Sequence, residues 1–467
     1  MSTNPLRSTL EHIEELESEV DHAILDLNQV PYPKVRHNLE VAGQNYRAGL
    51  VAIKNILNKL VERATAVEEL SASTGRKLTL HEALRKYWGK EVNQSYLTAE
   101  RFTTNFHLES QGGIPWELYY MVLDIFDGFG FNETFVFREG SHFMNETSEE
   151  TIIEVLDPLA KALQEPIPGR IDGQATREEI IPPISSAHAI SYIAGEARNA
   201  VLWPVLVHEA FHLLDKRLGL FGKMERSLVG SQRLPILDKT KDAEVNRRWS
   251  REIFQDIMAI HYFGPLYSHS LMRYFERLPY IQTIEHPEMS SRLYAVSKYL
   301  EDIRDAPLSG SDIVVKALRF CSPGLEAEMV KYRDSGELTK ETRLELDMFY
   351  RSVTAWLKLQ KTTLFRDRLR QYVDESEKAP QMAQLNNVDQ IPFVDPLLNF
   401  DEVVDLVFRS GVYPPLHPTL LLNIVLSVSD QFSPPGFYDR FVECMKKWCV
   451  KRAWNQAVAA SKNQEDK

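Results

Sequence analysis

Apolar residues recur every three or four positions over much of the chain, the spacing that places them on one face of an α-helix. Near the N-terminus this spacing predicts helices over 6–27 and 35–70, and Pro31 and Pro33 break the chain between them. The simplest arrangement of two such helices is an antiparallel hairpin. We therefore expect residues 1–95 to form a helical region that packs on the rest of the chain or receives a protein partner.

The middle of the chain mixes helical and extended patterns. The patterns predict helices over 115–126 and 149–163, and strands over 132–138 and 190–193. The strand over 190–193 has two interpretations: an exposed sheet edge that binds a peptide main chain to main chain, or a strand that only covers the core. A polar segment over 231–246 is interpreted either as a mobile flap or as a disordered loop.

Helical patterns return after Pro307, and they predict helices over 314–320, 338–372, 401–408, 420–428 and 438–460. The predicted fold class is therefore mainly α, with a small β-sheet (α+β). Its expected regions are an N-terminal helical region over 1–95, a core over 96–310 and a C-terminal helical region over 311–467.

Composition narrows the class of protein. A length of 467 residues with 43% hydrophobic content permits a sizeable core. No apolar run approaches the roughly 20 residues of a membrane helix, and the first residues lack the features of a secretory signal, so we expect a cytoplasmic protein without a membrane span. Three cysteines without a CxxC pair predict reduced core residues, and a net charge of −12 disfavours nucleic acid as a partner.

The segment His208-Glu209-Ala210-Phe211-His212 carries the clearest chemistry. Helix positions four apart lie nearly above one another, so His208 and His212 can bind one metal ion. Glu209 then lies beside the ion, where such a carboxylate accepts a proton from the attacking water. The alternative is an ordinary amphipathic helix whose two histidines lie at the polar edge of the core.

A catalytic zinc usually has three protein ligands, so this pair needs another donor. The extended pattern HExxHxxGxxH fails because Asp215 and Leu218 replace its glycine and last histidine. Glu252 and Asp256 share one stripe of a second predicted helix, which favours Glu252 as third ligand and Asp256 as acceptor for the outer N–H of a ligating histidine. The alternatives are Glu244 or His261 as the ligand, or a surface pair of Glu252 with Arg248 or Arg251.

HExxH on one helix with ExxxD on the next resembles the gluzincin metallopeptidases. The segment from Glu285 through His286 and Pro287 to Arg292 is similar to the element that follows the third ligand in the HtpX and CAAX-prenyl-protease type, although the membrane spans of those enzymes are absent. The resemblance implies a zincin-like core with one zinc ion, in which His286 and Arg292 border the cleft. Alternatively, the His-Pro pair only starts a helix over 290–303, with Arg292 in a surface ion pair.

The expected function is hydrolysis of peptide bonds in a peptide or protein substrate, with Glu209 as the general base. The donor to the oxyanion is left open between His286, Tyr262 and Tyr267. Two alternatives are a non-catalytic helical scaffold braced by zinc and a zinc hydrolase of a non-peptide amide.

Overall fold

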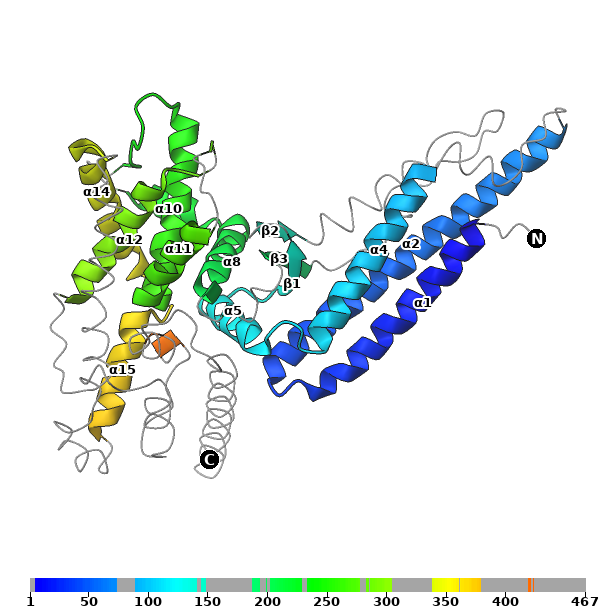
Figure 1. Cartoon of the computed structure of the whole chain (residues 1–467), viewed down its shortest axis with the longest axis horizontal. Coiled ribbons are helices and arrows are strands. Elements are labelled where there is room, and N and C mark those ends of the chain that lie inside the picture. Colours follow the sequence, from blue (N-terminus) through cyan, green and yellow to red (C-terminus); the bar gives the residue numbers. More distant parts are fainter. Residues whose placement is uncertain are drawn as a thin grey trace. The chain divides into compact units, whose positions relative to one another are not determined.

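The computed structural model divides the chain into two compact units (Figure 1). Unit 1 comprises Met1–Tyr120 and Asn132–Ala194, and unit 2 comprises Met121–Phe131 and Gly195–Lys467. The structure describes residues 5–73, 89–140, 144–147, 187–193, 199, 202–228, 233–277, 283–284, 286–304, 338–360, 362–378, 419, 420 and 423. The helices predicted over 149–163, 314–320, 401–408 and 438–460, and most of 420–428, lie outside the described residues.

Three long helices lie side by side in unit 1 (Figure 1). The predicted hairpin is confirmed as α1 (Pro5–Asp26) and α2 (Pro33–Ser73), which are joined by a short 3-10 turn, η1 (Leu27–Gln29). The third helix, α4 (Gly89–Ser110), packs on both of them. The apolar stripe of α1 faces its neighbours, since Ile13, Leu16 and Val20 are buried.

A three-stranded sheet completes the described part of unit 1. Its strands are β1 (Thr134–Gly140), β2 (Met144–Thr147) and β3 (Ala187–Ile193). β3 lies in the middle, parallel to β1 and antiparallel to β2. The expectation of a free edge at 190–193 is therefore wrong, because both sides of β3 are already paired. The alternation of apolar and polar residues along a strand indicates which of its faces is buried, but it does not indicate which strands pair with it.

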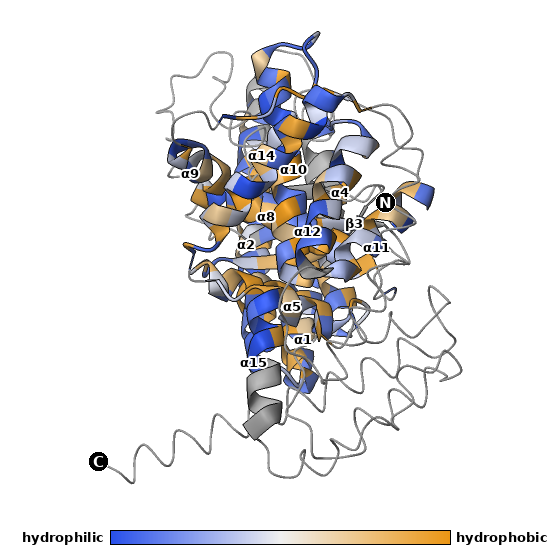
Figure 2. Cartoon of the chain, turned by 90° about the vertical axis from the view of Figure 1, so that its left-hand side faces the viewer, coloured by the Kyte–Doolittle hydropathy of each residue, from blue (hydrophilic) through white to orange (hydrophobic). Residues whose placement is uncertain are grey.

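Unit 2 is built around α10 (Ala243–Phe263), which packs against α8 (Trp203–Leu218), α11 (Pro265–Arg277), α12 (Met289–Arg304) and α14 (Lys340–Leu357). From Glu252 to Phe263 every residue of α10 is buried. Figure 2 shows hydrophobic residues along α8 and α10, whereas α15 (Phe365–Lys378) is mostly hydrophilic. α9 (Leu220–Ser227) follows α8 directly, and α5 (Trp116–Gly128) spans the boundary between the units.

The single helix predicted over 338–372 is two helices, α14 and α15, separated at residues 358–364. The side chain of Phe365 is buried against Gly264, where an added Cβ would lie 2.8 Å from the ring. Thr362 donates to the main-chain oxygen of Gly128 at 3.1 Å. These tertiary contacts favour a turn that the helical spacing of the sequence does not reveal.

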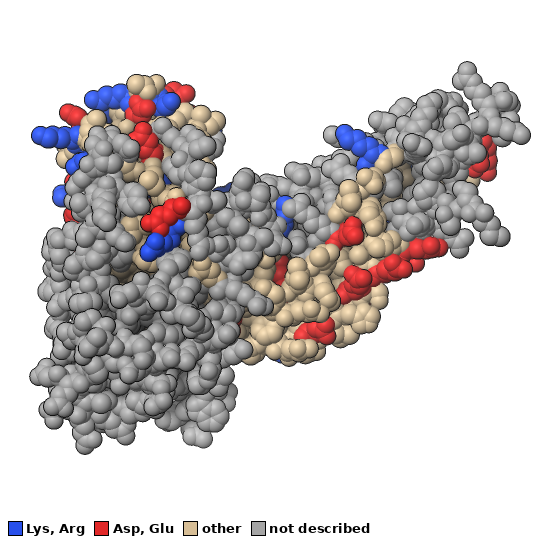
Figure 3. All heavy atoms as spheres, in the orientation of Figure 1, with Lys and Arg blue, Asp and Glu red and all other residues tan. Residues whose placement is uncertain are grey.

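Charged side chains of both signs lie next to each other at the upper end of unit 2 in Figure 3. At the start of α10, Arg247 pairs with Glu225 at 2.9 Å and Arg248 pairs with Glu244 at 3.3 Å. No helix in the described part of the chain is both long and apolar enough to cross a lipid bilayer.

Candidate metal centre

The HExxH segment lies on α8, as predicted. Pro204 occupies its first turn, where the missing N–H costs no hydrogen bond, and Gly219 ends the helix in a left-handed conformation with φ +62°. His208 is 2% exposed, while the side chain of His212 is 24% exposed. The helix therefore presents one histidine from the core and one at the edge of the site.

Asp215, at the position of the missing glycine, fixes α8 to its neighbours. One carboxylate oxygen accepts a hydrogen bond from the main-chain N–H of Phe221 at 2.6 Å, and the other lies 2.7 Å from Nε of Arg251 on α10. Because Arg251 pairs with Asp215 and Arg248 pairs with Glu244, neither forms the surface pair with Glu252 that was the alternative.

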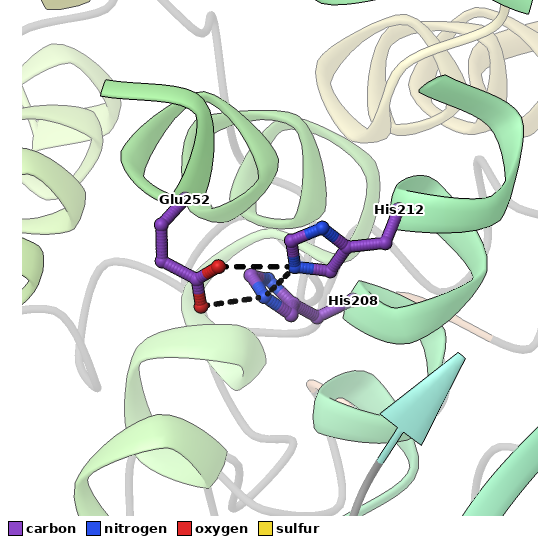
Figure 4. A group of neighbouring side chains, drawn as sticks. All are labelled: His208, His212 and Glu252. Carbon is purple, nitrogen blue, oxygen red and sulfur yellow. Dashed lines mark hydrogen bonds and ion pairs between the residues drawn. The ribbon is translucent and has the colours of Figure 1, made fainter. Parts of the chain in front are cut away.

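His208, His212 and Glu252 converge, as Figure 4 shows. The Nε2 atoms of the two histidines are 3.0 Å apart. Oε1 of Glu252 lies 3.2 Å from Nε2 of His208, and its Oε2 lies 3.1 Å from Nε2 of His212. Glu252 is thus the acidic partner of the pair, and the three form a buried group that can hold a metal ion. The other candidate ligands are engaged elsewhere: Glu244 with Arg248, and His261 with the hydroxyl of Thr354 at 3.0 Å.

These separations fit the coordination geometry of zinc. Zinc binds imidazole nitrogen and carboxylate oxygen at about 2.0–2.2 Å, and the corners of a tetrahedron of that size are about 3.3–3.6 Å apart. The two imidazole nitrogens, 3.0 Å apart, are only slightly closer than this, and Glu252 approaches each of them with a different oxygen, at 3.2 and 3.1 Å. An ion at the centre would require an outward shift of a few tenths of an ångström, within the reach of side-chain rotation.

Asp256 holds the outer side of His208, as predicted. Its Oδ1 lies 3.2 Å from Nδ1 of His208. The hydroxyl of Tyr267, on α11, donates to the same oxygen and lies 3.1 Å from the same ring nitrogen. In the neutral tautomer that carries its proton on Nδ1, the Nε2 lone pair of His208 points toward His212 and Glu252.

Arg292, on α12, joins the two carboxylates. Its Nε and Nη2 donate to Oδ2 and Oδ1 of Asp256, each at 2.7 Å, and its Nη1 lies 3.0 Å from Oε1 of Glu252. The side chain is 5% exposed, so the alternative of a surface ion pair is wrong. Arg292 instead supports the helix that carries Glu252. As predicted, α12 begins just after the His286-Pro287 pair.

These charges shift the pKa values of the group in the absence of a metal ion. Burial alone would raise the pKa of Glu252, but Arg292 and the two histidines hold it well below its ordinary value. Burial alone would lower the pKa of His208, yet Asp256 and then Glu252 outweigh it and raise the pKa to about 10. Glu252 and Asp256 are therefore ionised, and without a metal ion their negative charges are balanced by Arg292 and by the proton on His208.

Glu209 lies beside the group and is half-buried. Its carboxylate forms no hydrogen bond or ion pair with any described residue. Burial and the charges of Glu209 and Glu252 raise the pKa of the phenol of Tyr274, which also lies on α11. Tyr274 follows Tyr267 by seven residues and so shares its face of the helix. No pattern in the sequence points to Tyr274, because its position depends on the packing of α11 beside α8.

His286 borders the group without joining it. Its Nε2 lies 4.0 Å from Oε1 of Glu252, and its side chain is 48% exposed. Thr283 fixes this turn, since its Oγ1 accepts from the main-chain N–H of His286 at 3.0 Å and its carbonyl oxygen accepts from Trp249 at 3.0 Å.

The other two tyrosines considered as oxyanion donors have buried acidic partners. The hydroxyl of Tyr262 donates to Asp124 at 2.8 Å, and that of Tyr267 donates to Asp256. Each hydroxyl has one proton, so these contacts use the donor that an oxyanion would need.

The described part of the polar segment 231–246 is held by Asn246 on α10. The side-chain oxygen of Asn246 accepts from the main-chain N–H groups of Leu237 and Asp238 at 2.8 and 3.1 Å. Its nitrogen donates to the main-chain oxygens of Asp238, Lys241 and Asp242. Residues 237–242 thus form a turn fixed on the start of α10 and are not a disordered loop, while the interpretation as a mobile flap stays a prediction.

Protein-family models, curated proteins and solved structures were all compared with this chain, and none of them matches. The resemblance to gluzincins and the zincin-like core therefore stay predictions. What the structure itself supports is a mainly helical chain with a buried His208, His212 and Glu252 group that can hold a metal ion.

Proposed function

We propose that this chain is a zinc-dependent peptidase in which His208, His212 and Glu252 hold the ion and Glu209 is the general base. The observation that carries the proposal is that the Nε2 atoms of His208 and His212 lie 3.0 Å apart, and that the two carboxylate oxygens of Glu252 lie 3.2 and 3.1 Å from them. The half-buried carboxylate of Glu209, with no partner among the described residues, supports it. A site that only braces helices has no use for such a base.

Two imidazoles and one carboxylate are a donor set that suits zinc in hydrolytic enzymes, where a fourth position is kept for water. Asp256 fixes the tautomer of His208, and Arg292 balances part of the negative charge of Glu252 and Asp256. Partners of this kind are what a metal site needs to keep its ligands in place.

When bound, zinc supplies an electrophile that polarises a substrate carbonyl and lowers the pKa of water. Glu209 accepts the proton of the attacking water and then passes it to the leaving amine. The hydroxyl of Tyr274 is our choice for the donor to the developing oxyanion, because Tyr274 shares the face of α11 that carries Tyr267 and is near enough to Glu209 and Glu252 for their charges to raise its pKa. Arg292 keeps Glu252 ionised and oriented throughout.

The test compares the wild type with Glu209→Gln and with Glu244→Gln, a matched change at an exposed glutamate of α10. Metal content is measured by elemental analysis, and cleavage is measured on an unbiased peptide library. We expect zinc in all three proteins, and cleavage by the wild type and Glu244→Gln only. Bound zinc without cleavage by any of them contradicts the peptidase, and the zinc-braced scaffold or the hydrolysis of another amide then takes its place. A wild type without zinc contradicts the metal centre itself.

A further inference from the structure

Tyr267 touches the metal group from the side opposite the proposed ion. The side chain is fully buried, and its ring lies nearly parallel to that of His208, with 6.2 Å between centroids and 13° between planes. Its hydroxyl group contacts both Asp256 and His208. A tyrosine that served only to fill the core would not need this pair of polar contacts.

Asp256 can accept only a weak hydrogen bond from His208, because its carboxylate already has other donors. Its Oδ1 already accepts from Nη2 of Arg292 at 2.7 Å and from the hydroxyl of Tyr267. A carboxylate oxygen has two lone pairs, so a third donor, Nδ1 of His208 at 3.2 Å, is poorly served. The phenolic oxygen of Tyr267, at 3.1 Å from the same nitrogen, has lone pairs to offer.

We infer that Tyr267 is a positioning residue for the metal ligand His208. It donates its own proton to Asp256 and shares the Nδ1 proton of His208 with that carboxylate, while its ring limits rotation of the imidazole. The Nε2 lone pair is thereby fixed toward His212 and Glu252. This inference rests on the proposed zinc site, and it assigns part of the strength of metal binding to a neutral side chain on a third helix.

The test is the zinc affinity of Tyr267→Phe, measured by competition with a chromophoric chelator. Losing an outer partner of a metal ligand weakens binding by about 10–100-fold. Since Asp256 stays in place, we expect about a tenfold loss. Tyr262→Phe is the matched control: it removes an equally buried tyrosine hydroxyl that donates to Asp124 at 2.8 Å, away from the ligands. Its zinc affinity should stay within about twofold of the wild type.

The absorption spectrum of the cobalt-substituted proteins distinguishes a change at the metal ligands from a general loss of stability, because it reports the ligand geometry directly. We expect shifted d–d bands in Tyr267→Phe and unchanged bands in Tyr262→Phe. Equal zinc affinities and equal spectra for the wild type and Tyr267→Phe contradict the positioning role of Tyr267 but leave the proposed zinc site in place. No zinc binding by the wild type contradicts the proposed function, and this inference falls with it.

If Tyr267→Phe does not fold, the zinc-loaded wild type provides the test. In protein labelled with ¹⁵N-histidine, the Nδ1 proton of His208 should show a nuclear Overhauser contact to the hydroxyl proton of Tyr267. A His208 that carries its proton on Nε2, or an Nδ1 proton with no contact to the tyrosine, contradicts the inference.

Discussion

Asp256 and Arg292 form a buried ion pair with two hydrogen bonds, from Nε to Oδ2 and from Nη2 to Oδ1, each 2.7 Å long. The flat guanidinium group matches the carboxylate edge to edge, an arrangement that lysine cannot reproduce. The third nitrogen of the same group reaches Glu252 at 3.0 Å. One cation thus holds two buried acids in their places.

Arg292→Gln leaves both acids without their cation, and removing one partner of a buried ion pair costs about 3–5 kcal/mol. We expect a loss of that size in the free energy of unfolding, measured by urea denaturation with a chelator present so that no metal contributes. Arg292→Lys should recover only part of it. The control is Arg273→Gln, which breaks a half-exposed pair with Glu276 and should change the stability by less than about 1 kcal/mol. A loss under 1 kcal/mol for Arg292→Gln would show that the pair contributes little.

Glu252→Gln removes the acidic donor of the metal group while preserving the size of the side chain. We expect zinc affinity to fall by more than the 10–100-fold that loss of an outer partner costs, because a ligand itself is lost. Isothermal titration calorimetry with zinc measures the change. Glu244→Gln, on the exposed start of the same helix, should bind as the wild type does. Similar affinities for the two variants would exclude Glu252 as a ligand.

Tyr274→Phe tests the donor to the oxyanion. Removing one such donor typically lowers kcat by about 10²–10³-fold, and we expect a loss of this order with little change in KM. His286→Gln, which changes a half-exposed side chain 4.0 Å from Glu252, serves as the comparison and should have a smaller effect on kcat. The opposite ranking, measured on the best peptide from the library, would transfer the role to His286.

His261 makes stability depend on pH. It is buried between the rings of Tyr299 and Tyr350, and burial lowers its pKa from 6.5 to about 3. A lowered histidine pKa contributes stability that is present above pH 6.5 and is lost as the pH falls toward 3, because the unfolded chain takes up the proton first. The full difference amounts to at most about 5 kcal/mol.

Urea unfolding between pH 7 and pH 4 measures this dependence. His261→Gln should show a flatter decline than the wild type, whereas His22→Gln, an exposed histidine of α1, should follow the wild type. Identical slopes for the wild type and His261→Gln would mean that folding leaves the pKa of His261 unchanged.

Glu109, in unit 1, gives the opposite pH dependence: it lowers the stability of the protein as the pH rises. This glutamate of α4 is fully buried, and burial raises the pKa of its carboxyl well above the ordinary value, with Tyr119 offsetting only part of the rise. A raised carboxyl pKa contributes stability below about pH 4.5 that is lost as the pH rises through the folded-state pKa. Glu109→Gln should therefore stabilise the protein at pH 8 by about 1–3 kcal/mol. Glu100→Gln, exposed on the same helix, is the control, and thermal unfolding of both at pH 5 and pH 8 decides the matter.

Much of the candidate site could be predicted from the sequence, because its parts lie on helices whose spacing is visible in it. His208 and His212 are four apart on α8, and Glu252 and Asp256 are four apart on α10. Helical geometry then limits which side chains point the same way. The ranges of α1, α2 and α12 follow from the same periodicity; α1 and α2 begin at Pro5 and Pro33, and α12 begins two residues after Pro287.

The parts that could not be predicted depend on contacts between distant segments. The place of β3 in its sheet depends on β1 and β2, and the break between α14 and α15 depends on Phe365 meeting Gly264. The proposed roles of Tyr267 and Tyr274 depend on α11 packing beside α8, which no local pattern encodes. Asn246 fixes the turn before α10 through main-chain groups, whose positions are not visible in a list of residue types.

The position of Glu252 forty residues after His212 has a mechanical consequence. A metal ion bound by both residues would close the intervening stretch, α9 and the turn on Asn246 included, into a loop, and an ion that binds only the folded chain stabilises that loop. A chelator can remove the ion. Resistance of residues 213–251 to a protease should then rise and fall with the metal content of the sample.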